Sequence, residues 1–310
     1  MSAASKRPGD PARAIVTGGA GFVGSHLVDR LLAEGYAVLV VDDLSSGRPE
    51  NVATGAELER LDIATDDLEP VFRRWRPRVV FHLAAQASVP LSMSAPLRDL
   101  AVNVGGTHHV TAAARSAGAD RLVFVSSGGA VYGETKRPAT EETRPAPASY
   151  YGVHKLAAEG HVALGGLAYA IARPSNIYGP RQSAGLEGAV VAAFLDQARG
   201  GALRIHGDGS QTRDFVHVRD VVDALWRLGG AAAPIGIWNV AAGHGVSVVA
   251  LADTVERAVG RPLERVFSAR RPGDVTHSAV SPGRLKRLGW VPSTGLAAGV
   301  RELVRLLPDA

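Results

Sequence analysis

The sequence predicts an α/β fold, a doubly wound parallel sheet followed by a smaller C-terminal α/β lobe. Two observations lead to this prediction. In the first half of the chain short β-rich runs alternate with helical patterns, which is typical of parallel sheets. After Arg173 the pattern changes to loops punctuated by glycine and proline, as in RPSNIYGPRQ and RIHGDGSQTRDF. A chain of 310 residues has room for one large domain, or for a domain with a smaller lobe.

The elements of the sheet are expected in turn along the first half of the chain. We expect strands at 14–16, 37–41, before 61–63, and at 79–83, 122–125 and 168–172. We expect helices at 22–33, 68–75, 97–117 and 151–164. About six strands connected in this way match the strand order of dinucleotide-binding sheets.

The second half is expected to form the lobe, with one return to the sheet. A helix is predicted near 188–199, GGAAAPIG at 229–236 is interpreted as a loop, and 236–242 is expected to rejoin the main sheet as a late strand. We therefore place a nucleotide-binding domain at 1–175 and a lobe at 176–310, with the two interleaved.

Composition restricts the possible classes of protein. The chain is 46% hydrophobic and 21% charged, without cysteine, which removes disulfides, thiolate nucleophiles and cysteine-based zinc sites. No tract is apolar for long enough to span a bilayer, and 1–11 lacks an apolar signal core, so a cytoplasmic protein is expected. The net charge of +4 is spread along the chain, which argues against a nucleic-acid partner. His108 and His109 point to different faces of a helix, so no metal site is expected.

A glycine-rich turn predicts the nucleotide site. In VTGGAGFVGSH, residues 16–26, Gly18, Gly21 and Gly24 stand between a strand and a helix, where they allow pyrophosphate to approach backbone N–H groups. Asp42 follows the second strand, 18 residues after Gly24, where a carboxylate accepts from an adenosine ribose and repels the extra phosphate of NADP. NAD is therefore the expected cofactor. Asp42 as a turn residue is the alternative, and Asp62 is either an adenine contact or a strand-end aspartate.

A tyrosine and a lysine predict the chemistry. In SYYGVHKLAAE, Tyr151 and Lys155 are four residues apart, so they share a face of a helix. The ammonium, together with a positive nicotinamide ring, lowers the phenol pKa toward neutrality, and the tyrosine becomes a general base for a hydroxyl of the substrate. The alternative is a packed tyrosine beside a lysine that reaches to solvent, but the chain has only four lysines. Tyr150, whose partner at that spacing is His154, is interpreted as a packing residue or a sugar contact.

These motifs, in this order, resemble the extended short-chain dehydrogenase/reductase superfamily, and within it the nucleotide-sugar epimerases and dehydratases, most of all the UDP-glucose 4-epimerase-like proteins. The resemblance also rests on DDLSSG (42–47), HLAAQASV (82–89), NVGGT (103–107), SSGGAVYG (126–133), GDGSQTRDFVHVRD (207–220) and RRPGD (270–274). It implies a Rossmann fold, a tightly bound NAD that is regenerated in each cycle, a UDP-sugar substrate, and a homodimer formed through the helices at 97–117 and 151–164. It implies neither a nucleic-acid nor a membrane partner.

The resemblance assigns residues to the two ligands. The implied NAD contacts are Gly18, Gly21, Phe22, Val23, Gly24, Asp42, Asp43, Leu44, Ser46, Gly47, Asp62, Ile63, Leu83, Ala84, Ala85, Gln86, Asn103, Val125, Tyr151, Lys155 and Pro174. The implied substrate contacts are Ser88, Val89, Ser127, Gly128, Gly129, Tyr151, Asn176, Arg181, Val190, Arg213, Arg271 and Asp274.

The segment SSGGAVYG departs from the family pattern. The position that usually carries a catalytic Ser or Thr, counted back from Tyr132, holds Gly128. We expect Ser127, or a water molecule, to take that role, with Ser126 as a second candidate; the alternative is that both serines cap the strand. Related dehydratases carry an Asp-Glu pair, and related decarboxylases a Glu, where this chain has Gly129 and Ala130. Elimination therefore lacks its acid, and oxidation followed by reduction remains.

Within the lobe, the resemblance places Asn176 at the diphosphate or sugar, Arg213 and Arg271 at phosphate, and Asp274 at the uridine ribose. One guanidinium group can bind two phosphate oxygens at once. The alternative is that these arginines form surface ion pairs with neighbouring aspartates. Arg181 is a candidate for neutralising a carboxylate at C6 of the sugar, but related glucuronate epimerases have an arginine where this chain has Ser183. Glucose and glucuronate therefore both remain open.

The expected function is a UDP-hexose 4-epimerase, acting on UDP-glucose or UDP-glucuronate through a transient 4-keto sugar. One alternative is another nucleotide-sugar dehydrogenase or reductase, which consumes its cofactor. The other is a non-catalytic NAD-binding regulatory protein of the same fold.

Overall fold

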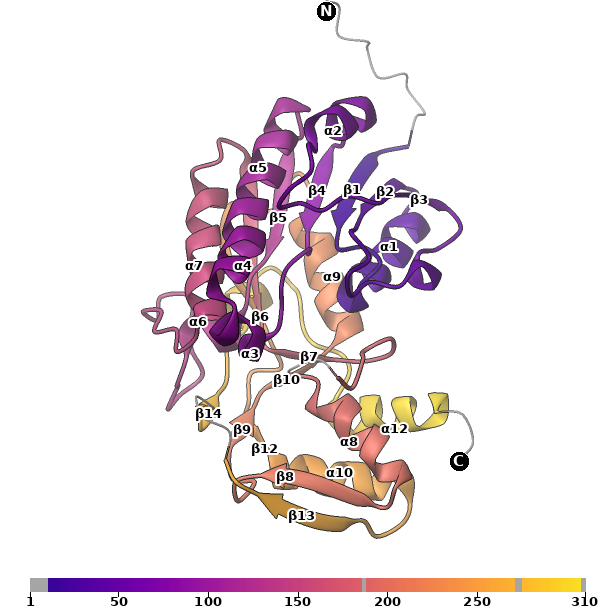
Figure 1. Cartoon of the computed structure of the whole chain (residues 1–310), viewed down its shortest axis with the longest axis vertical. Coiled ribbons are helices and arrows are strands. Elements are labelled where there is room, and N and C mark those ends of the chain that lie inside the picture. The colour runs from indigo at the N-terminus through magenta and orange to yellow at the C-terminus, as the bar shows by residue number, and fades with distance from the viewer. Residues whose placement is uncertain (1–10, 186–187, 271–274, 308–310) are drawn as a thin grey trace, which may run out of the picture.

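The computed structural model describes residues 11–185, 188–270 and 275–307. A large sheet flanked by helices forms one part of the molecule, and a smaller lobe lies beyond one end of its strands (Figure 1). No helix in these three ranges combines the length and the apolar character needed to cross a bilayer.

The main sheet has seven strands in the order β11-β6-β5-β4-β1-β2-β3, and every pairing is parallel. The strands are β1 (Arg13–Thr17), β2 (Ala37–Val41), β3 (Ala56–Glu59), β4 (Val79–His82), β5 (Arg121–Val125), β6 (Ala168–Pro174) and β11 (Gly236–Val240). The strand order reverses between β1 and β4, and ligands of such sheets bind beyond the carboxyl ends of the strands at this reversal.

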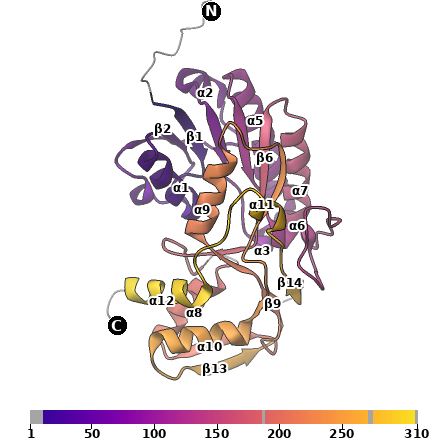
Figure 2. The same ribbon diagram turned by 180° about the vertical axis from the view of Figure 1, so that it is seen from behind.

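Helices cover both faces because the strands are apolar on both sides. On one face α1 (Phe22–Ala33) and α9 (Val218–Leu228) pack on residues such as Val16 and Val40 (Figure 2). On the other, α2 (Glu69–Trp75), α5 (Thr107–Ser116) and α7 (Tyr150–Ala163) pack on residues such as Ile15 and Leu39. The two cores hold the strand ends, and therefore the loops that follow them, in fixed positions.

The helix expected at 97–117 is present but interrupted. It consists of α4 (Pro96–Leu100), a π-helical segment η2 (Ala101–Gly106) and α5, and it follows the short α3 (Val89–Ser94). A Cβ at Gly106 would lie 2.6 Å from Cδ1 of Ile63, so the absence of a side chain lets this segment approach the loop after β3. A π-helical turn is wider than an α-helical one, so it re-aims the side chains at this point of the helix.

The lobe combines three small sheets with helices. Strands β7 (Asn176–Tyr178) and β10 (Phe215–His217) pair, β9 (Thr212–Arg213) lies between β12 (Val246–Ser247) and β14 (His277–Ser278), and β8 (Ala202–His206) pairs with β13 (Glu264–Ser268). Helices α8 (Val190–Arg199), α10 (Val248–Val259) and α12 (Leu296–Leu306) share a core with these strands, including Phe194, Leu251 and Val300. Because β11 is a strand of the main sheet and α9 packs on that sheet, the chain leaves the lobe after β10 and enters the lobe again after β11. The remaining short helices are η1 (Pro49–Asn51), α6 (Gly128–Tyr132) and α11 (Gly283–Lys286).

Candidate active site

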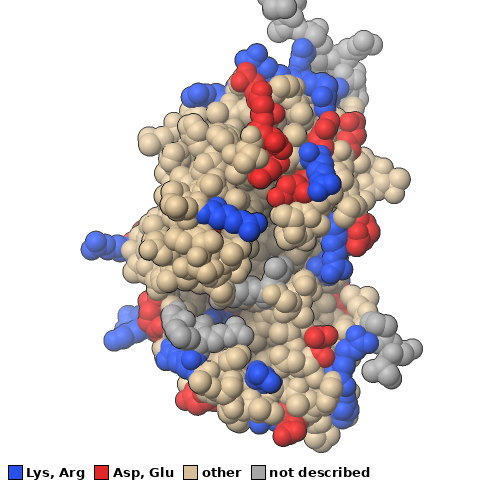
Figure 3. Space-filling view, viewed as in Figure 1, with Lys and Arg blue, Asp and Glu red and all other residues tan. Residues whose placement is uncertain are grey.

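A cavity of about 1210 Å³ lies at the carboxyl ends of the sheet strands and continues into the lobe. Its wall includes the turn after β1, the N-terminal part of α7 and strand β8 of the lobe. In Figure 3 the molecular surface is hollowed between the part that contains the main sheet and the lobe. The location agrees with the rule that doubly wound sheets bind ligands where the strand order reverses.

The glycine turn brings bare backbone to one end of the cavity. Gly18 has φ of +70°, and a Cβ there would lie 2.6 Å from the backbone nitrogen of Ala84. A Cβ at Gly24 would lie 2.0 Å from the carbonyl oxygen of Gly18, so α1 can start this close to β1 only with glycine. No side chain caps the N-terminus of α1, and its first N–H groups are available to a pyrophosphate. The residues present therefore fit a dinucleotide.

Asp42 lies in the wall beside this turn, at the end of β2. Its carboxylate accepts hydrogen bonds from the backbone N–H of Ala20 (3.0 Å) and of Leu44 (2.9 Å). Burial raises the pKa of Asp42, and these two hydrogen bonds oppose the shift. A carboxylate oxygen can accept more than one hydrogen bond, so both oxygens can still receive ribose hydroxyls. The turn role and the binding role thus belong to the same side chain.

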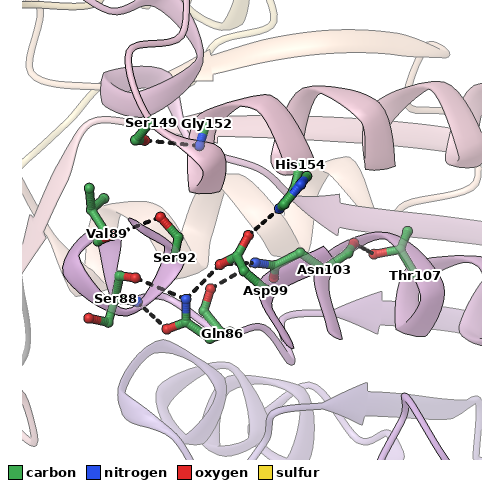
Figure 4. Close-up of polar contacts among 10 residues, drawn as sticks. All are labelled: Gln86, Ser88, Val89, Ser92, Asp99, Asn103, Thr107, Ser149, Gly152 and His154. Atoms are coloured by element: carbon green, nitrogen blue, oxygen red, sulfur yellow. Dashed lines mark hydrogen bonds and ion pairs between the residues drawn. The ribbon is translucent and has the colours of Figure 1, made fainter. Parts of the chain in front are cut away.

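Tyr151 and Lys155 both line the cavity where its two ends meet. The helix that carries them, α7, begins after Ser149, whose Oγ accepts from the N–H of Gly152 at 3.2 Å (Figure 4). A Cβ at Gly152 would lie 2.4 Å from the carbonyl oxygen of Ala130, so glycine lets this first turn pack directly on α6.

Lys155 is almost completely buried, with 2% of its surface exposed. Its Nζ lies 4.2 Å from the centre of the Phe124 ring. Burial lowers the pKa of Lys155 to about 7, and the carboxylates of Glu159 and Asp99 act in the opposite direction. A lysine in this state changes its charge within the range in which enzymes work.

The two serines at the end of β5 have different surroundings. Ser127 lines the cavity and begins α6, its Oγ accepting from the N–H of Ala130 at 3.2 Å. Ser126 is 3% exposed and donates its hydroxyl proton to Glu159 at 2.5 Å, in a buried group that also contains Arg173. Ser126 also lines the cavity, and its hydroxyl satisfies a buried carboxylate, so a catalytic role for Ser126 stays a prediction.

Gly128 turns away from the cavity and does not line it. A Cβ there would lie 3.0 Å from Cγ2 of Val280 and 3.1 Å from the carbonyl oxygen of Arg173. A hydroxyl at the position usual in the family would thus enter a crowded site in this chain, and Gly128 as a substrate contact stays a prediction.

Three further predicted residues are not part of the wall. Leu44 continues the turn after Asp42 in a left-handed conformation, with φ of +62°. Asn103 is buried and donates to the carbonyl of Gln86 and to Asp99. Arg181 forms an ion pair with Asp29 of α1 at 2.8 Å, and its role beside a C6 carboxylate stays a prediction. Arg271 and Asp274 lie outside the described residues.

The other predicted residues all line the cavity. They are Gly18, Gly21, Phe22, Val23, Gly24, Asp42, Asp43, Ser46, Gly47, Asp62, Ile63, Leu83, Ala84, Ala85, Gln86, Ser88, Val89, Val125, Ser126, Ser127, Gly129, Tyr151, Lys155, Pro174, Asn176, Val190 and Arg213.

The sequence analysis missed polar residues at the lobe end of the cavity. Arg204 and His206, two residues apart on β8, line it together with Gln182, Gln197 and Gln211. The signal was available in RIHGDGSQTR, because residues two apart on a strand face the same side. With Arg213 they make this end cationic, which fits a diphosphate.

The carboxylates of the wall are all at the nucleotide end. Among the described residues the cavity is lined by Asp42, Asp43 and Asp62 and by no other acid, and Gly129 and Ala130 are part of its wall. No group of three His, Asp or Glu side chains in the described part of the chain is arranged to hold a metal ion. Tyr151 and Lys155 line the cavity in a part of its wall where the described residues supply no carboxylate.

Comparisons with known proteins agree with this arrangement. The profile of the NAD dependent epimerase/dehydratase family matches residues 14–241. A UDP-glucose 4-epimerase of Mycolicibacterium smegmatis is 43% identical over 304 residues, which cover 94% of this chain and 97% of that protein. The crystal structure of UDP-glucose 4-epimerase from Thermotoga maritima with UDP-glucose superposes with a TM-score of 0.89 at 38% identity, covering 94% of this chain and 97% of that one. The Thermus thermophilus UDP-glucose 4-epimerase in complex with NAD gives 0.90 at 39% identity, covering 94% and 98%.

Proposed function

Because the chain belongs to the NAD-dependent epimerase/dehydratase family, we propose that it is a UDP-glucose 4-epimerase, which interconverts UDP-glucose and UDP-galactose. One observation carries the proposal: a single cavity joins a dinucleotide turn to a cationic lobe, with Tyr151 and Lys155 at the junction. The relatives named above are UDP-glucose 4-epimerases, and each of them aligns with almost the full length of this chain.

NAD is held by the sheet domain, which we place at 1–175. The turn from Gly18 to Gly24 offers backbone N–H groups to the pyrophosphate, and Asp42 offers its carboxylate to the adenosine ribose. The negative charge of Asp42 disfavours the extra phosphate of NADP. When bound, NAD supplies a hydride acceptor at the nicotinamide end of this site.

The nucleotide sugar is held by the lobe, placed at 176–310. Arg204 and Arg213 attract the diphosphate, and Asn176 and Val190 lie in the wall between it and the centre of the cavity. Ser88, Val89 and Gly129 complete the space for the hexose.

Tyr151 moves the proton. Its phenolate takes the proton of the 4-hydroxyl as the C4 hydride leaves the sugar, and returns the proton when a hydride comes back to the other face of C4. Lys155 stabilises the phenolate through its charge, and Ser127 orients the hydroxyl. Each cycle is redox-neutral and needs no other reagent. Its net result is inversion of the configuration at C4.

Two features separate this reaction from those of other family members. Gly129 and Ala130 leave the centre of the cavity without the carboxylates that dehydratases and decarboxylases of the family use, so the sugar keeps its C6 group. Arg181, the residue considered for a C6 carboxylate, is paired with Asp29 outside the cavity. The first feature sets the reaction type, and the second favours UDP-glucose over UDP-glucuronate.

A homodimer is proposed through the helices that cover one face of the sheet. Large apolar side chains are exposed there, with Leu97 on α4 79% exposed, Val153 on α7 46% and Leu164 at the end of α7 88%. Figure 1 shows α4 and α5 following one another along one line, with α7 beside them on the outer surface. A second copy of the chain would bury this apolar surface through the same helices.

The experiment that tests the function is proton NMR of the sugar after incubation of the purified protein, without added cofactor, with UDP-glucose and separately with UDP-glucuronate. A galacto anomeric signal is expected from UDP-glucose, without net change in NAD. Consumption of added NAD in proportion to product would instead indicate a dehydrogenase or reductase. Retained NAD without turnover of either sugar would indicate a non-catalytic binding protein.

A further inference from the structure

A carboxylate lies buried beside the candidate active site. Asp99, on α4, has no exposed surface and accepts hydrogen bonds from three side chains: His154 Nδ1 at 2.5 Å, Gln86 Nε2 at 2.6 Å and Asn103 Nδ2 at 3.1 Å (Figure 4). Removing a carboxylate from water is unfavourable unless donors surround it. The three donors are therefore fixed relative to one another by a single acceptor.

The Gln86 branch leads to one wall of the cavity. The amide of Gln86 also closes the turn that follows β4: its Nε2 donates to the carbonyl of Ser88 at 2.9 Å, and its Oε1 accepts from the N–H of Ser88 at 2.6 Å. Gln86, Ser88 and Val89 all line the cavity. Asp99 thus supports the wall assigned above to the cofactor and the hexose.

The His154 branch leads to the opposite wall. His154 lies on α7, three residues after Tyr151 and immediately before Lys155. Because an ionised carboxylate only accepts hydrogen bonds, Nδ1 of His154 carries the proton. The His154 ring also stacks on Tyr150, with ring centres 6.0 Å apart. The bond to Asp99 therefore joins the helical turn that carries both reacting side chains to α4.

We propose that the buried Asp99–His154 pair is a positioning device, which holds Tyr151 and Lys155 in register with the cavity wall formed by Gln86, Ser88 and Val89. The proposal rests on the proposed function in assigning the chemistry to Tyr151 and Lys155. A misplacement of about 1 Å at a reacting group costs roughly 100-fold in rate, so the pair matters for turnover without contact with substrate.

The pair also acts on Lys155 through its charge. The groups that face the Lys155 ammonium are Glu159 on α7, Asp99 on α4, the Phe124 ring on β5 and His82 on β4. His82 is completely buried, and burial lowers its pKa to about 3, so it contributes no positive charge. Asp99 and Glu159 favour the charged lysine; replacing Asp99 by a neutral residue therefore lowers the pKa of Lys155 below about 7.

The first test needs no substrate. The chain has four lysines, so the protein labelled with ¹³C-lysine gives few side-chain signals, and Lys155→Arg identifies that of Lys155. In Asp99→Asn we expect the titration midpoint of Lys155 to fall by roughly one pH unit. The matched control is Asp220→Asn: Asp220, on α9, is 4% exposed and accepts from Ser293 and Thr294 on the opposite face of the sheet. It should leave the midpoint unchanged.

The second test separates positioning from folding. His154→Leu should lower kcat at least about tenfold with KM within about twofold of the wild type. His154→Asn should restore most of the loss, because Nδ2 of asparagine takes the place of Nδ1 and again donates to Asp99.

The proposal is overturned if the titration midpoint of Lys155 is the same in the wild type and in Asp99→Asn. It is also overturned if kcat of His154→Leu stays within twofold of the wild type, or is no lower than kcat of His154→Asn. A wild type that turns over no UDP-glucose would refute the proposed function, and the lysine titration would still decide on the pair.

Discussion

Adjacent tyrosines at the start of α7 have different surroundings. Tyr151 lines the cavity, whereas Tyr150 is 46% exposed and does not line it. We expect Tyr151→Phe to lower kcat by about 10²- to 10⁴-fold, because the general base is lost, while UDP-glucose still binds. Tyr150→Phe keeps the ring that stacks on His154 and serves as the control, with turnover near that of the wild type. Epimerisation followed by NMR, with UDP binding by calorimetry, measures both. Near-normal turnover in Tyr151→Phe would contradict the assignment.

The neighbouring serines give a second prediction at the residue scale. Ser127→Ala should lower kcat, because Ser127 lines the cavity, and loss of its N-cap hydrogen bond should lower the free energy of unfolding by about 0.5–2 kcal/mol. Ser126→Ala removes a donor from the buried Glu159 and should lower the free energy of unfolding by about 1–3 kcal/mol. Urea unfolding and kcat, measured on both variants, check the assignment. The reverse pattern, a loss of kcat only in Ser126→Ala, would instead assign the catalytic role to Ser126.

The residue scale also shows what a sequence can reveal. Tyr151, Lys155 and Asp42 could be found because their chemistry depends on local spacing along one helix or after one strand. The partners of Ser126 and His154 could not be found, since Glu159 and Asp99 come from distant segments and meet only through packing. The ion pair of Arg181 could not be found for the same reason: Asp29, its partner, lies on α1.

At the scale of elements, the bounds of β1, α1 and β2 follow closely from the sequence because apolar runs and a glycine turn define them. The interruption of the long helix by η2 was not predicted. Within this segment Gly106 packs against Ile63, a tertiary contact across about 40 positions of the chain that leaves no periodic signal.

Two adjacent glycines of η2 allow a matched test of this contact. A Cβ at Gly106 would meet Ile63 at 2.6 Å, whereas a Cβ at Gly105 would have nothing within 4 Å. We therefore expect Gly106→Ala to lower the free energy of unfolding by about 1–3 kcal/mol through overpacking. Gly105→Ala should be neutral or stabilising by up to about 1 kcal/mol, because alanine favours helix. Urea unfolding of both variants measures the difference. Equal stability of the two would show that Ile63 moves aside and does not shape the segment.

At the scale of the whole molecule, the doubly wound sheet was predictable and the details of the lobe were not. The sheet repeats one unit of strand and helix, so its pattern recurs along the chain. The lobe is built from short strands, such as β9 with two residues, which are too short for a periodicity to be detected. The chain returns from the lobe to the sheet through α9 and β11 before it enters the lobe again.

The proposed homodimer is the last prediction, and it belongs to the molecule as a whole. Leu164 is 88% exposed at the end of α7, beside a groove that includes His108 and Arg115 of α5. A charge placed in an apolar interface is strongly unfavourable, so Leu164→Asp should shift the protein from dimer to monomer. Val291 is the matched control: it is 62% exposed and follows Trp290, which packs into the core on the opposite face of the sheet. Val291→Asp should leave the dimer intact. Light scattering after gel filtration measures the molar mass. A wild type that elutes as a monomer would exclude the dimer, and a Leu164→Asp variant that remains a dimer would place the contact elsewhere. Because α7 also carries Tyr151 and Lys155, the monomeric variant should keep its fold by circular dichroism while kcat falls, if the second copy helps hold α7 in place.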